Sequence, residues 1–465
     1  MGKKIDIDSD GAIVLRIRWK PTLKVLVVLI AATLSGFLPL PGLTDASRIC
    51  LMIFIGAAGL WVTEAIPPFA TAIMVIVLSV FLLGRPDGPM QNAADYRIFI
   101  NPIASPVLAL FFGGFVLALA ASKHGFDVRL ARAFIKPFGT RPHMVLLGVI
   151  SITALFSMFM SNTATTAMMI AILAPVFHNF EGRDPFKVAL VLSVPFAANI
   201  GGMGTIIGTP PNAVAASVLA GLGHPITFFT WMMFAVPIVI VLLLILWFLL
   251  ITVLKPRNDH LELLFPEDLE LTWDFVVVVI TFTTTVTLWL TEPLHGIPSA
   301  VVALLPVMIF TMFGIINRED LRKIEWHILI LVAGGLTLGV AMSATGLSTI
   351  LVHLLAFESL SPVMLLVAIT LVGLVISNFM SNTAAANLLI PITTSLTVIS
   401  PALGGIAAAL ACSLAMSLPI STPPNAIAFA TQEVDTATMA KYGTVVSLFG
   451  AVVVITALML LQNWL

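Results

Sequence analysis

Apolar segments long enough to cross a lipid bilayer recur along the whole 465-residue chain. A helix rises 1.5 Å per residue, so about 20 apolar residues cross about 30 Å of hydrocarbon. Hydrophobic residues make up 59% of the chain and charged residues only 10%, whereas about a quarter of the residues of a soluble domain are charged. This composition excludes an ordinary water-soluble protein. It predicts an all-α polytopic membrane protein with about 11 spans.

Some apolar segments have the length of one membrane span. They are 22–40, 48–66, 68–84, 105–122, 226–254, 273–291, 298–315 and 441–463. Others are harder to interpret, because several are too long for one span and contain no charge that would mark a turn. They are 144–177, 188–222, 327–353, 363–398 and 402–430. We therefore look for the functional residues in this second group.

The basic residues indicate the orientation of the chain, because cytoplasmic loops collect Lys and Arg. We assume a cytoplasmic amino terminus and hairpins at 144–177 and 363–398 that return to their starting side. All Lys and Arg residues except Arg48, Arg85 and Arg97 then face the cytoplasm. The cytoplasmic segments are 1–24, 123–142, 179–187, 255–272, 316–326 and 431–441. This pattern predicts a multi-pass topology with a cytoplasmic amino terminus, and we expect the protein in the cell inner (plasma) membrane.

The chain repeats three motifs in the same order. The matching pairs are 111–126 with 332–347, 156–169 with 376–389, and 208–216 with 421–429. With the predicted orientation, the first repeat begins outside and the second begins inside. Inverted repeats with interrupted helices are typical of secondary transporters. The predicted parts are an amino terminus with the first span (1–47), a first repeat (48–254), a cytoplasmic linker (255–272) and a second repeat (273–465).

Segment 144–177 would be about 51 Å long as one helix, which is longer than a bilayer is thick. A break at Ser161-Asn162-Thr163 turns it into a re-entrant hairpin, because Ser, Asn and Thr favour helix ends. The first amide groups of the second arm then form an anion site inside the membrane. Segment 363–398 repeats this design around Ser381-Asn382-Thr383, entering from the opposite face.

Tandem prolines predict broken helices within 188–222 and 402–430. The motifs are Gly208-Thr209-Pro210-Pro211-Asn212 and Ser421-Thr422-Pro423-Pro424-Asn425. Proline lacks an amide donor, so the carbonyls of Gly208 and Ser421 lose their helical partners and become ligands for a hard cation.

Two serine pairs add to these candidate cation sites. Ser157 precedes Ser161 by four residues, as Ser377 precedes Ser381, and hydroxyls four apart share a helix face. With Asn162 or Asn382 and the freed carbonyl, each half offers uncharged oxygens that suit Na⁺.

The distribution of charged residues limits the kind of substrate that the pocket can bind. Segments 188–254 and 359–432 contain no Asp, Glu, Lys or Arg, so the suspected pocket has no basic side chain from these regions. A small dianion near the middle of the membrane therefore needs cations that bind with it. We expect at least two co-transported Na⁺ ions. The formal net charge of -1 gives no reason to expect a nucleic-acid partner.

In its paired SNT motifs at hairpin tips and its paired downstream TPPN motifs, the chain resembles the divalent anion/sodium symporter (DASS) family. The resemblance implies that both tips bind the carboxylates of a dicarboxylate, assisted by Thr209, Thr422 and the adjoining Pro210 and Pro423. It implies one sodium site of Ser157, Ser161, Asn162 and Gly208, and another of Ser377, Ser381, Asn382 and Ser421. It also implies a homodimer that works as an elevator.

We therefore expect sodium-coupled symport of C4 dicarboxylates such as succinate, malate and fumarate into the cell. Sodium-coupled transport of citrate or sulfate, and sodium-independent dicarboxylate exchange, remain alternatives. A channel would need a continuous polar lining, and no catalytic motif for a membrane enzyme is apparent in the sequence. We interpret Glu64 as an interfacial anchor beside Trp61, with a buried functional acid as the alternative, and His327 as an interfacial residue. We interpret Cys50 and Cys412 as inert packing residues.

Overall fold

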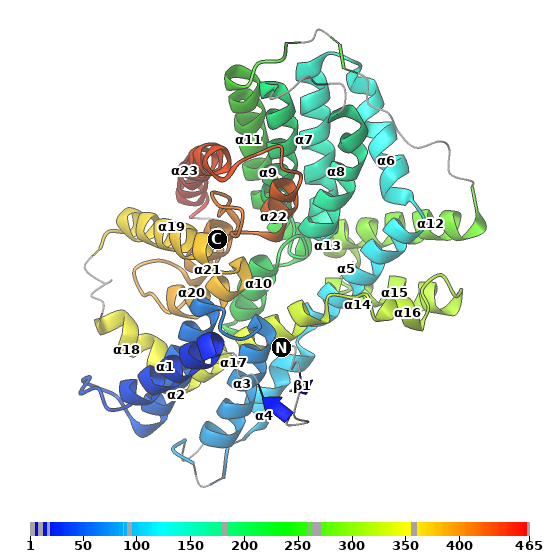
Figure 1. Ribbon diagram of the computed structural model, residues 1–465. Coiled ribbons are helices and arrows are strands. Elements are labelled where there is room, and N and C mark those ends of the chain that lie inside the picture. Colours follow the sequence, from blue (N-terminus) through cyan, green and yellow to red (C-terminus); the bar gives the residue numbers. More distant parts are fainter. Residues whose placement is uncertain are drawn as a thin grey trace.

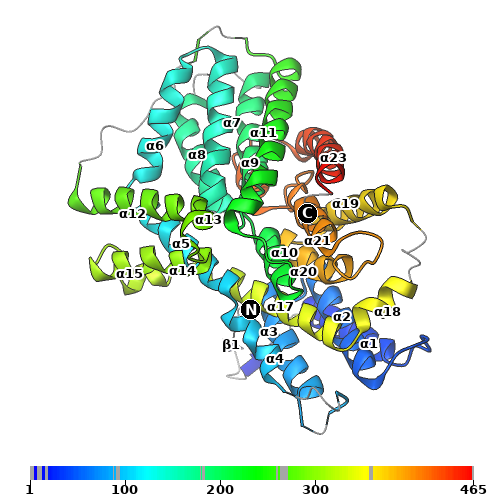
Figure 2. The same cartoon turned by 180° about the vertical axis from the view of Figure 1, so that it is seen from behind.

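The computed structural model describes residues 5–7, 13–15, 19–86, 88–90, 95–177, 180, 184–257, 260–261, 271–354 and 360–462. The described part is built almost entirely of helices (Figures 1 and 2). A short antiparallel ribbon, β1 (Ile5–Ile7) and β2 (Ile13–Leu15), precedes the first helix. Parts of the predicted amino-terminal segment 1–47 and most of the predicted linker 255–272 lie outside the described residues.

The first half of the chain forms eleven α-helices and three short turns of other helical types. The α-helices are α1 (Trp19–Ser35), α2 (Asp45–Thr63), α3 (Pro68–Leu78), α4 (Arg97–Ile100), α5 (Pro106–Lys123), α6 (Phe126–Ile135), α7 (Pro142–Phe159), α8 (Asn162–Phe177), α9 (Pro185–Gly202), α10 (Pro210–Gly221) and α11 (Phe228–Val253). The π-helical turn is η1 (Ser79–Leu83), and the 3₁₀ turns are η2 (Asn101–Ala104) and η3 (Lys136–Phe138).

The second half begins after the linker. Its helices are α12 (Trp273–Leu290), α13 (Glu292–His295), α14 (Ser299–Val302), α15 (Leu304–Met312), α16 (Arg318–Leu321), α17 (Trp326–Ala344), α18 (Leu347–Leu354), α19 (Pro362–Phe379), α20 (Asn382–Thr393), α21 (Pro401–Ser413), α22 (Pro423–Ala430) and α23 (Thr436–Leu461). Both halves therefore contain long helices interrupted at the SNT and TPPN motifs.

Nine helices among the described residues are long and apolar enough to cross a membrane. The chain is an integral membrane protein with an all-α fold. The predicted span 298–315 is a shorter apolar helix, Ser299–Met312, with a local interruption at Ala303 that divides α14 from α15. Pro306 explains the interruption: it has no amide proton to donate to the carbonyl of Val302 one turn earlier. Segment 123–142 is also more than a loop, because it contains the amphipathic helix α6.

Paired glycines in the matching segments 111–126 and 332–347 allow helices to approach closely. A Cβ atom on Gly113 would lie 1.9 Å from the carbonyl oxygen of Ala303. A Cβ atom on Gly334 would lie 2.4 Å from the Cβ atom of Ala72. Any larger residue at either position would force these helices apart. The repeated Gly-Gly sequence thus has the same packing role in both halves.

The short helices that follow the TPPN motifs pack on the opposite half of the chain. Helix α10 lies against α20 and α21 of the second half. Helix α22 lies against α8 and α9 of the first half, at the lower end of the upright group of helices in Figure 1. This exchange brings the two SNT motifs and the two TPPN motifs to one central region of the molecule (Figures 1 and 2).

Candidate functional site

The two SNT motifs form matching breaks between helices. Helix α7 ends at Phe159 and α8 begins at Asn162, while α19 ends at Phe379 and α20 begins at Asn382. The residue after each first arm, Met160 or Met380, is extended. Each predicted hairpin segment is therefore two helices that meet at its SNT motif.

Matching hydrogen bonds hold both tips. The hydroxyl of Ser157 donates to Oδ1 of Asn162 at 2.5 Å and to the carbonyl oxygen of Ala198 at 2.8 Å. In the second half, Ser377 donates to Oδ1 of Asn382 at 2.7 Å and to the carbonyl oxygen of Cys412 at 2.8 Å. Each bonding pattern ties a tip to the neighbouring broken helix.

The expected pairing of serines along one helix face is wrong. Ser161 and Ser381 lie beyond the ends of α7 and α19, so the four-residue spacing is not a helical turn there. The helices end because the backbone becomes extended at Met160 and Met380. Ser157 consequently contacts Asn162, the residue after Ser161.

The asparagines of the TPPN motifs hold the broken segments in shape. The side-chain amide of Asn212 donates to the carbonyl oxygens of Gly202, Met203 and Thr205 at 2.8–3.3 Å. The side-chain amide of Asn425 donates to those of Met416 and Leu418, both at 3.0 Å. A buried asparagine thus replaces the hydrogen bonds that the unwound backbone cannot make.

The prolines leave the carbonyls of Gly208 and Ser421, the predicted cation ligands, without amide donors from a continuing helix. Pro211 and Pro424 stand three residues after Gly208 and Ser421 and have no amide proton. In a regular helix the amide four residues later would donate to each of these carbonyls. Instead, the amide of Asn212 donates to the carbonyl oxygen of Thr209 at 3.2 Å. The amide of Asn425 donates to the hydroxyl of Thr422 at 3.3 Å.

Both tips and both broken helices line one cavity of about 520 Å³. All the residues predicted to contact substrate border it. They are Ser161, Asn162, Thr163, Thr209, Pro210, Ser381, Asn382, Thr383, Thr422 and Pro423. Gly208 and Ser421 of the predicted sodium sites border it too, whereas Ser157 and Ser377 are fully buried and contact Asn162 and Asn382.

Three groups of the first predicted sodium site converge beside Gly202. A Cβ atom on Gly202 would lie 2.6 Å from Oδ1 of Asn162 and 3.0 Å from the carbonyl oxygen of Gly208. Ser157 reaches the same amide oxygen. These neutral oxygens form a donor set suited to a hard monovalent cation.

The cavity also contains charged and titratable side chains that the sequence patterns missed. Glu64, Glu325 and His327 border it, so placing Glu64 and His327 only at the membrane interface is incomplete. Glu64 directly follows α2, Glu325 directly precedes α17 and His327 lies in its first turn, all outside the uncharged segments. For Glu64 the sequence offers a buried functional acid as an alternative, whereas only the tertiary packing brings Glu325 and His327 to the tips. None of the described lining residues is Lys or Arg.

The two tips differ in how their serines are used. The hydroxyl of Ser381 accepts a hydrogen bond from the amide of Ala384 at 3.2 Å and so caps α20. The hydroxyl of Ser161 instead donates to Oε1 of Glu325 at 3.1 Å. A side-chain carboxylate therefore contacts the first tip, where the sequence predicts a substrate carboxylate.

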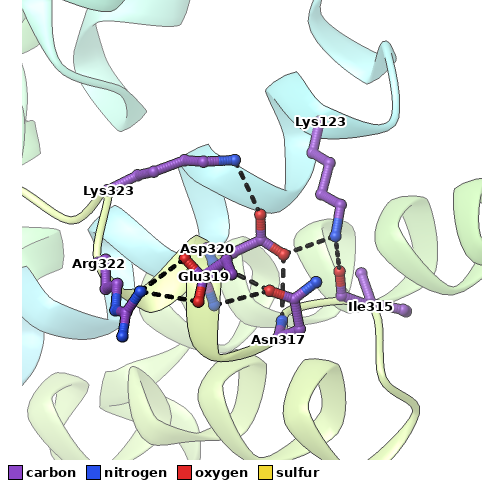
Figure 3. A network of polar contacts seen from close by, with 7 residues as sticks. All are labelled: Lys123, Ile315, Asn317, Glu319, Asp320, Arg322 and Lys323. Atoms are coloured by element: carbon purple, nitrogen blue, oxygen red, sulfur yellow. Dashed lines mark hydrogen bonds and ion pairs between the residues drawn. The ribbon is translucent and has the colours of Figure 1, made fainter.

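A polar network fixes the segment that precedes Glu325 (Figure 3). Lys123, at the end of α5, donates to Oδ2 of Asp320 at 2.6 Å and to the carbonyl oxygen of Ile315 at 2.7 Å. Asp320 also contacts Lys323 at 3.1 Å and accepts from the amide of Asn317. The hydrogen bond from Lys123 lowers the pKa of Asp320 to about 2, against the opposing effect of burial.

We expect Asp320→Asn to destabilise the protein by about 2 kcal/mol at neutral pH, because it leaves Lys123 without its charged partner. The stabilisation exists above pH 3.8, the ordinary pKa, and disappears as the pH falls towards about 2. Thermal unfolding of the purified protein measures the change. Glu319→Gln is the matched control, since its pair with Arg322 is exposed and such pairs contribute little. Equal melting temperatures for both variants would contradict this role of Asp320.

Two solved transporter structures share the fold. The YdaH transporter of Alcanivorax borkumensis has a TM-score of 0.61 and 14% identity, covering 86% of this chain and 99% of that chain. MtrF of Neisseria gonorrhoeae has a TM-score of 0.55 and 12% identity, covering 86% of this chain and 96% of that chain. At such low identity the likeness concerns the fold alone.

Sequence relatives identify the family. The family model described as "Citrate transporter" (CitMHS) matches residues 58–402 and 286–464. The sodium-dependent dicarboxylate transporter SdcS of Staphylococcus saprophyticus is 32% identical and covers 92% of this chain and 88% of its own length. SdcS of Staphylococcus aureus is 31% identical and covers 87% and 84%. These relatives are transporters, which agrees with the prediction that the chain is not an enzyme. With its paired SNT and TPPN motifs, the chain belongs to the divalent anion/sodium symporter family.

Proposed function

We propose that this protein couples the inward movement of Na⁺ to the uptake of C4 dicarboxylates such as succinate, malate and fumarate. The observation that carries the proposal is the single cavity of about 520 Å³ lined by both SNT tips and both TPPN breaks. Two separated helix starts suit a ligand with two carboxylates. The names of the SdcS relatives support both sodium dependence and a dicarboxylate substrate.

Electrostatics supports coupling. The described cavity lining contains Glu64 and Glu325 but no Lys or Arg, so a dianion entering alone would be repelled. A cation about 4 Å from a substrate carboxylate contributes about 4 kcal/mol at an effective dielectric constant near 20. At least two Na⁺ ions are therefore expected to bind with the substrate.

The proposed roles of the residues follow their positions. The tips at 161–163 and 381–383 hold the two carboxylates, with Thr209, Pro210, Thr422 and Pro423 beside them. The proposed sodium ligands form one set in each half. They are Ser157, Ser161, Asn162 and Gly208 in the first half, and Ser377, Ser381, Asn382 and Ser421 in the second half.

The larger organisation is part of the same proposal. The repeats 48–254 and 273–465 are inverted, and a homodimer in the inner membrane carries substrate by an elevator movement with its amino terminus in the cytoplasm. The matching hydrogen bonds of the two tips support the repeat. Glu325 lies within the predicted cytoplasmic segment 316–326 and also borders the cavity, which favours an inward-open state.

Uptake of radiolabelled succinate into proteoliposomes tests the proposal. We expect uptake driven by an inward Na⁺ gradient and competition by malate and fumarate. Unchanged uptake after Na⁺ is replaced by choline would refute symport and favour exchange. Stronger competition by citrate or sulfate than by malate would reassign the substrate, and single-channel currents would indicate a channel.

We expect Glu325→Gln to lower the KM for succinate about tenfold. The negative side chain of Glu325 contacts Ser161, so it repels an incoming carboxylate and competes with it for the hydroxyl. Initial uptake rates against succinate concentration measure this change. Glu319→Gln removes an equal charge outside the cavity and should leave the KM unchanged. An unchanged or higher KM for Glu325→Gln would exclude charge repulsion between Glu325 and the substrate, because the amide oxygen of Gln can still accept from Ser161.

A further inference from the structure

Asn199 borders the cavity but belongs to neither repeated motif. It lies near the end of α9, is 1% exposed and reaches across to the second half of the chain. Its Nδ2 atom lies 3.2 Å from the hydroxyl oxygen of Thr422 and 3.3 Å from Oδ1 of Asn425. These contacts depend on the packing of α22 against α9.

The neighbouring hydrogen bonds determine which way the amide of Asn199 points. Nδ2 of Asn425 already donates to the carbonyl oxygens of Met416 and Leu418. The Oδ1 atom of Asn425 therefore faces Asn199 as an acceptor, and only an amide NH₂ group can satisfy it. The donor side of Asn199 consequently faces both Asn425 and Thr422.

This arrangement leaves the proton of the Thr422 hydroxyl available. A hydroxyl group has two lone pairs and one proton. The oxygen of Thr422 accepts from Nδ2 of Asn199 and from the amide of Asn425 at 3.3 Å. Thr422 itself borders the cavity. With both lone pairs engaged, the hydroxyl can offer its proton to an acceptor in the cavity.

The corresponding threonine of the first half lacks this arrangement. The ungapped match of segments 199–212 and 412–425 sets Cys412 opposite Asn199, whereas the matching tip hydrogen bonds to Ala198 and Cys412 set Ser413 there. The hydroxyl of Ser413 bonds within its own helix, to the carbonyl oxygen of Ala409 at 3.1 Å. A thiol is a weak donor, and the amide of Asn212 donates to the carbonyl of Thr209, not to its hydroxyl. The Oδ1 atom of Asn212, which corresponds to the acceptor in Asn425, is buried without a partner. The hydroxyl of Thr209 is therefore not oriented in this way.

We propose that Asn199 is a positioning residue that makes the Thr422 hydroxyl a hydrogen-bond donor to one substrate carboxylate. The subsite beside Thr422 therefore favours a hydrogen-bond-accepting group, such as a carboxylate, more strongly than the subsite beside Thr209 does. This inference rests on the proposed function, because it assumes that a dicarboxylate occupies the cavity. Asn199 acts through Thr422 and need not touch the substrate.

A double-mutant cycle tests this role by succinate uptake into proteoliposomes under a fixed Na⁺ gradient. We expect Asn199→Ala and Thr422→Val each to raise the KM about tenfold and to retain most of the maximal rate. In the Thr422→Val background, Asn199→Ala should raise the KM less than twofold further, because the hydroxyl it orients is already absent. Ser193→Ala is the matched control on α9, since that hydroxyl bonds within its own helix at 2.7 Å.

If the double variant raises the KM by the product of the two single-variant factors, the positioning role of Asn199 is overturned. An unchanged KM for Asn199→Ala would overturn it as well. If the alanine variant has a lowered melting temperature, Asn199→Leu preserves the side-chain volume and removes the donor, so the same cycle is measured with it. Sodium-driven uptake by the unmodified protein separates the two claims. Its absence refutes the proposed function and this inference with it, whereas its presence together with multiplicative effects refutes the inference alone.

Discussion

Replacing either tip asparagine with alanine is expected to reduce sodium-driven succinate uptake at least about 100-fold. Asn162 and Asn382 border the cavity, and each accepts a hydrogen bond from a buried serine, Ser157 or Ser377. Each variant removes an oxygen from a proposed sodium site and a group beside the substrate. Two interactions with charged partners at about 1.5 kcal/mol each correspond to about 100-fold.

Initial uptake rates of Asn162→Ala and Asn382→Ala measure this loss, with size-exclusion profiles to show that the protein remains folded. Asn101→Ala serves as the control, since Asn101 is exposed in η2. A fully active variant carrying both tip substitutions would contradict the assignment of the site to the SNT motifs.

Gly202→Ala is expected to raise the Na⁺ concentration for half-maximal uptake at least about tenfold. The added Cβ atom would lie 2.6 Å from Oδ1 of Asn162 and 3.0 Å from the carbonyl oxygen of Gly208. The short Asn162 side chain must then move away from Ser157, which separates the proposed ligands. Loss of one cation ligand of this kind costs about 1.4 kcal/mol or more.

The Na⁺ dependence of succinate uptake at a fixed succinate concentration measures this shift. Gly221→Ala is a matched control, because a Cβ atom on Gly221 meets nothing within 4 Å. A wild-type Na⁺ dependence in Gly202→Ala would show that no sodium ion binds between Asn162 and Gly208.

The sequence predicts the broken helices well because their causes are local. A run of apolar residues too long for a bilayer must turn, and the polar SNT residues offer a favourable place near the middle of each run. The break between α7 and α8 lies at that motif. Tandem prolines remove two amide donors wherever they occur, so the interruptions between α9 and α10 and between α21 and α22 are equally predictable.

Sequence patterns miss features that depend on weak periodicity or on contacts between residues far apart in the chain. The amphipathic α6 has the wrong pattern for a span and was expected only as part of a cytoplasmic segment. The contact of Ser161 with Glu325 joins residues 164 positions apart. No periodicity or motif relates such residues, since their approach depends on how α17 packs beside the first tip.

By itself, the sequence determined a membrane-embedded helical protein, its interrupted helices and the polar residues at each interruption, because hydrophobic length and missing amide donors act within a few residues. Only the tertiary structure decided that α10 and α22 pack on opposite halves. That exchange gives the two tips a common cavity and sets Asn199 beside Thr422. Helix packing depends on shape complementarity between surfaces far apart in the chain, which one sequence does not reveal.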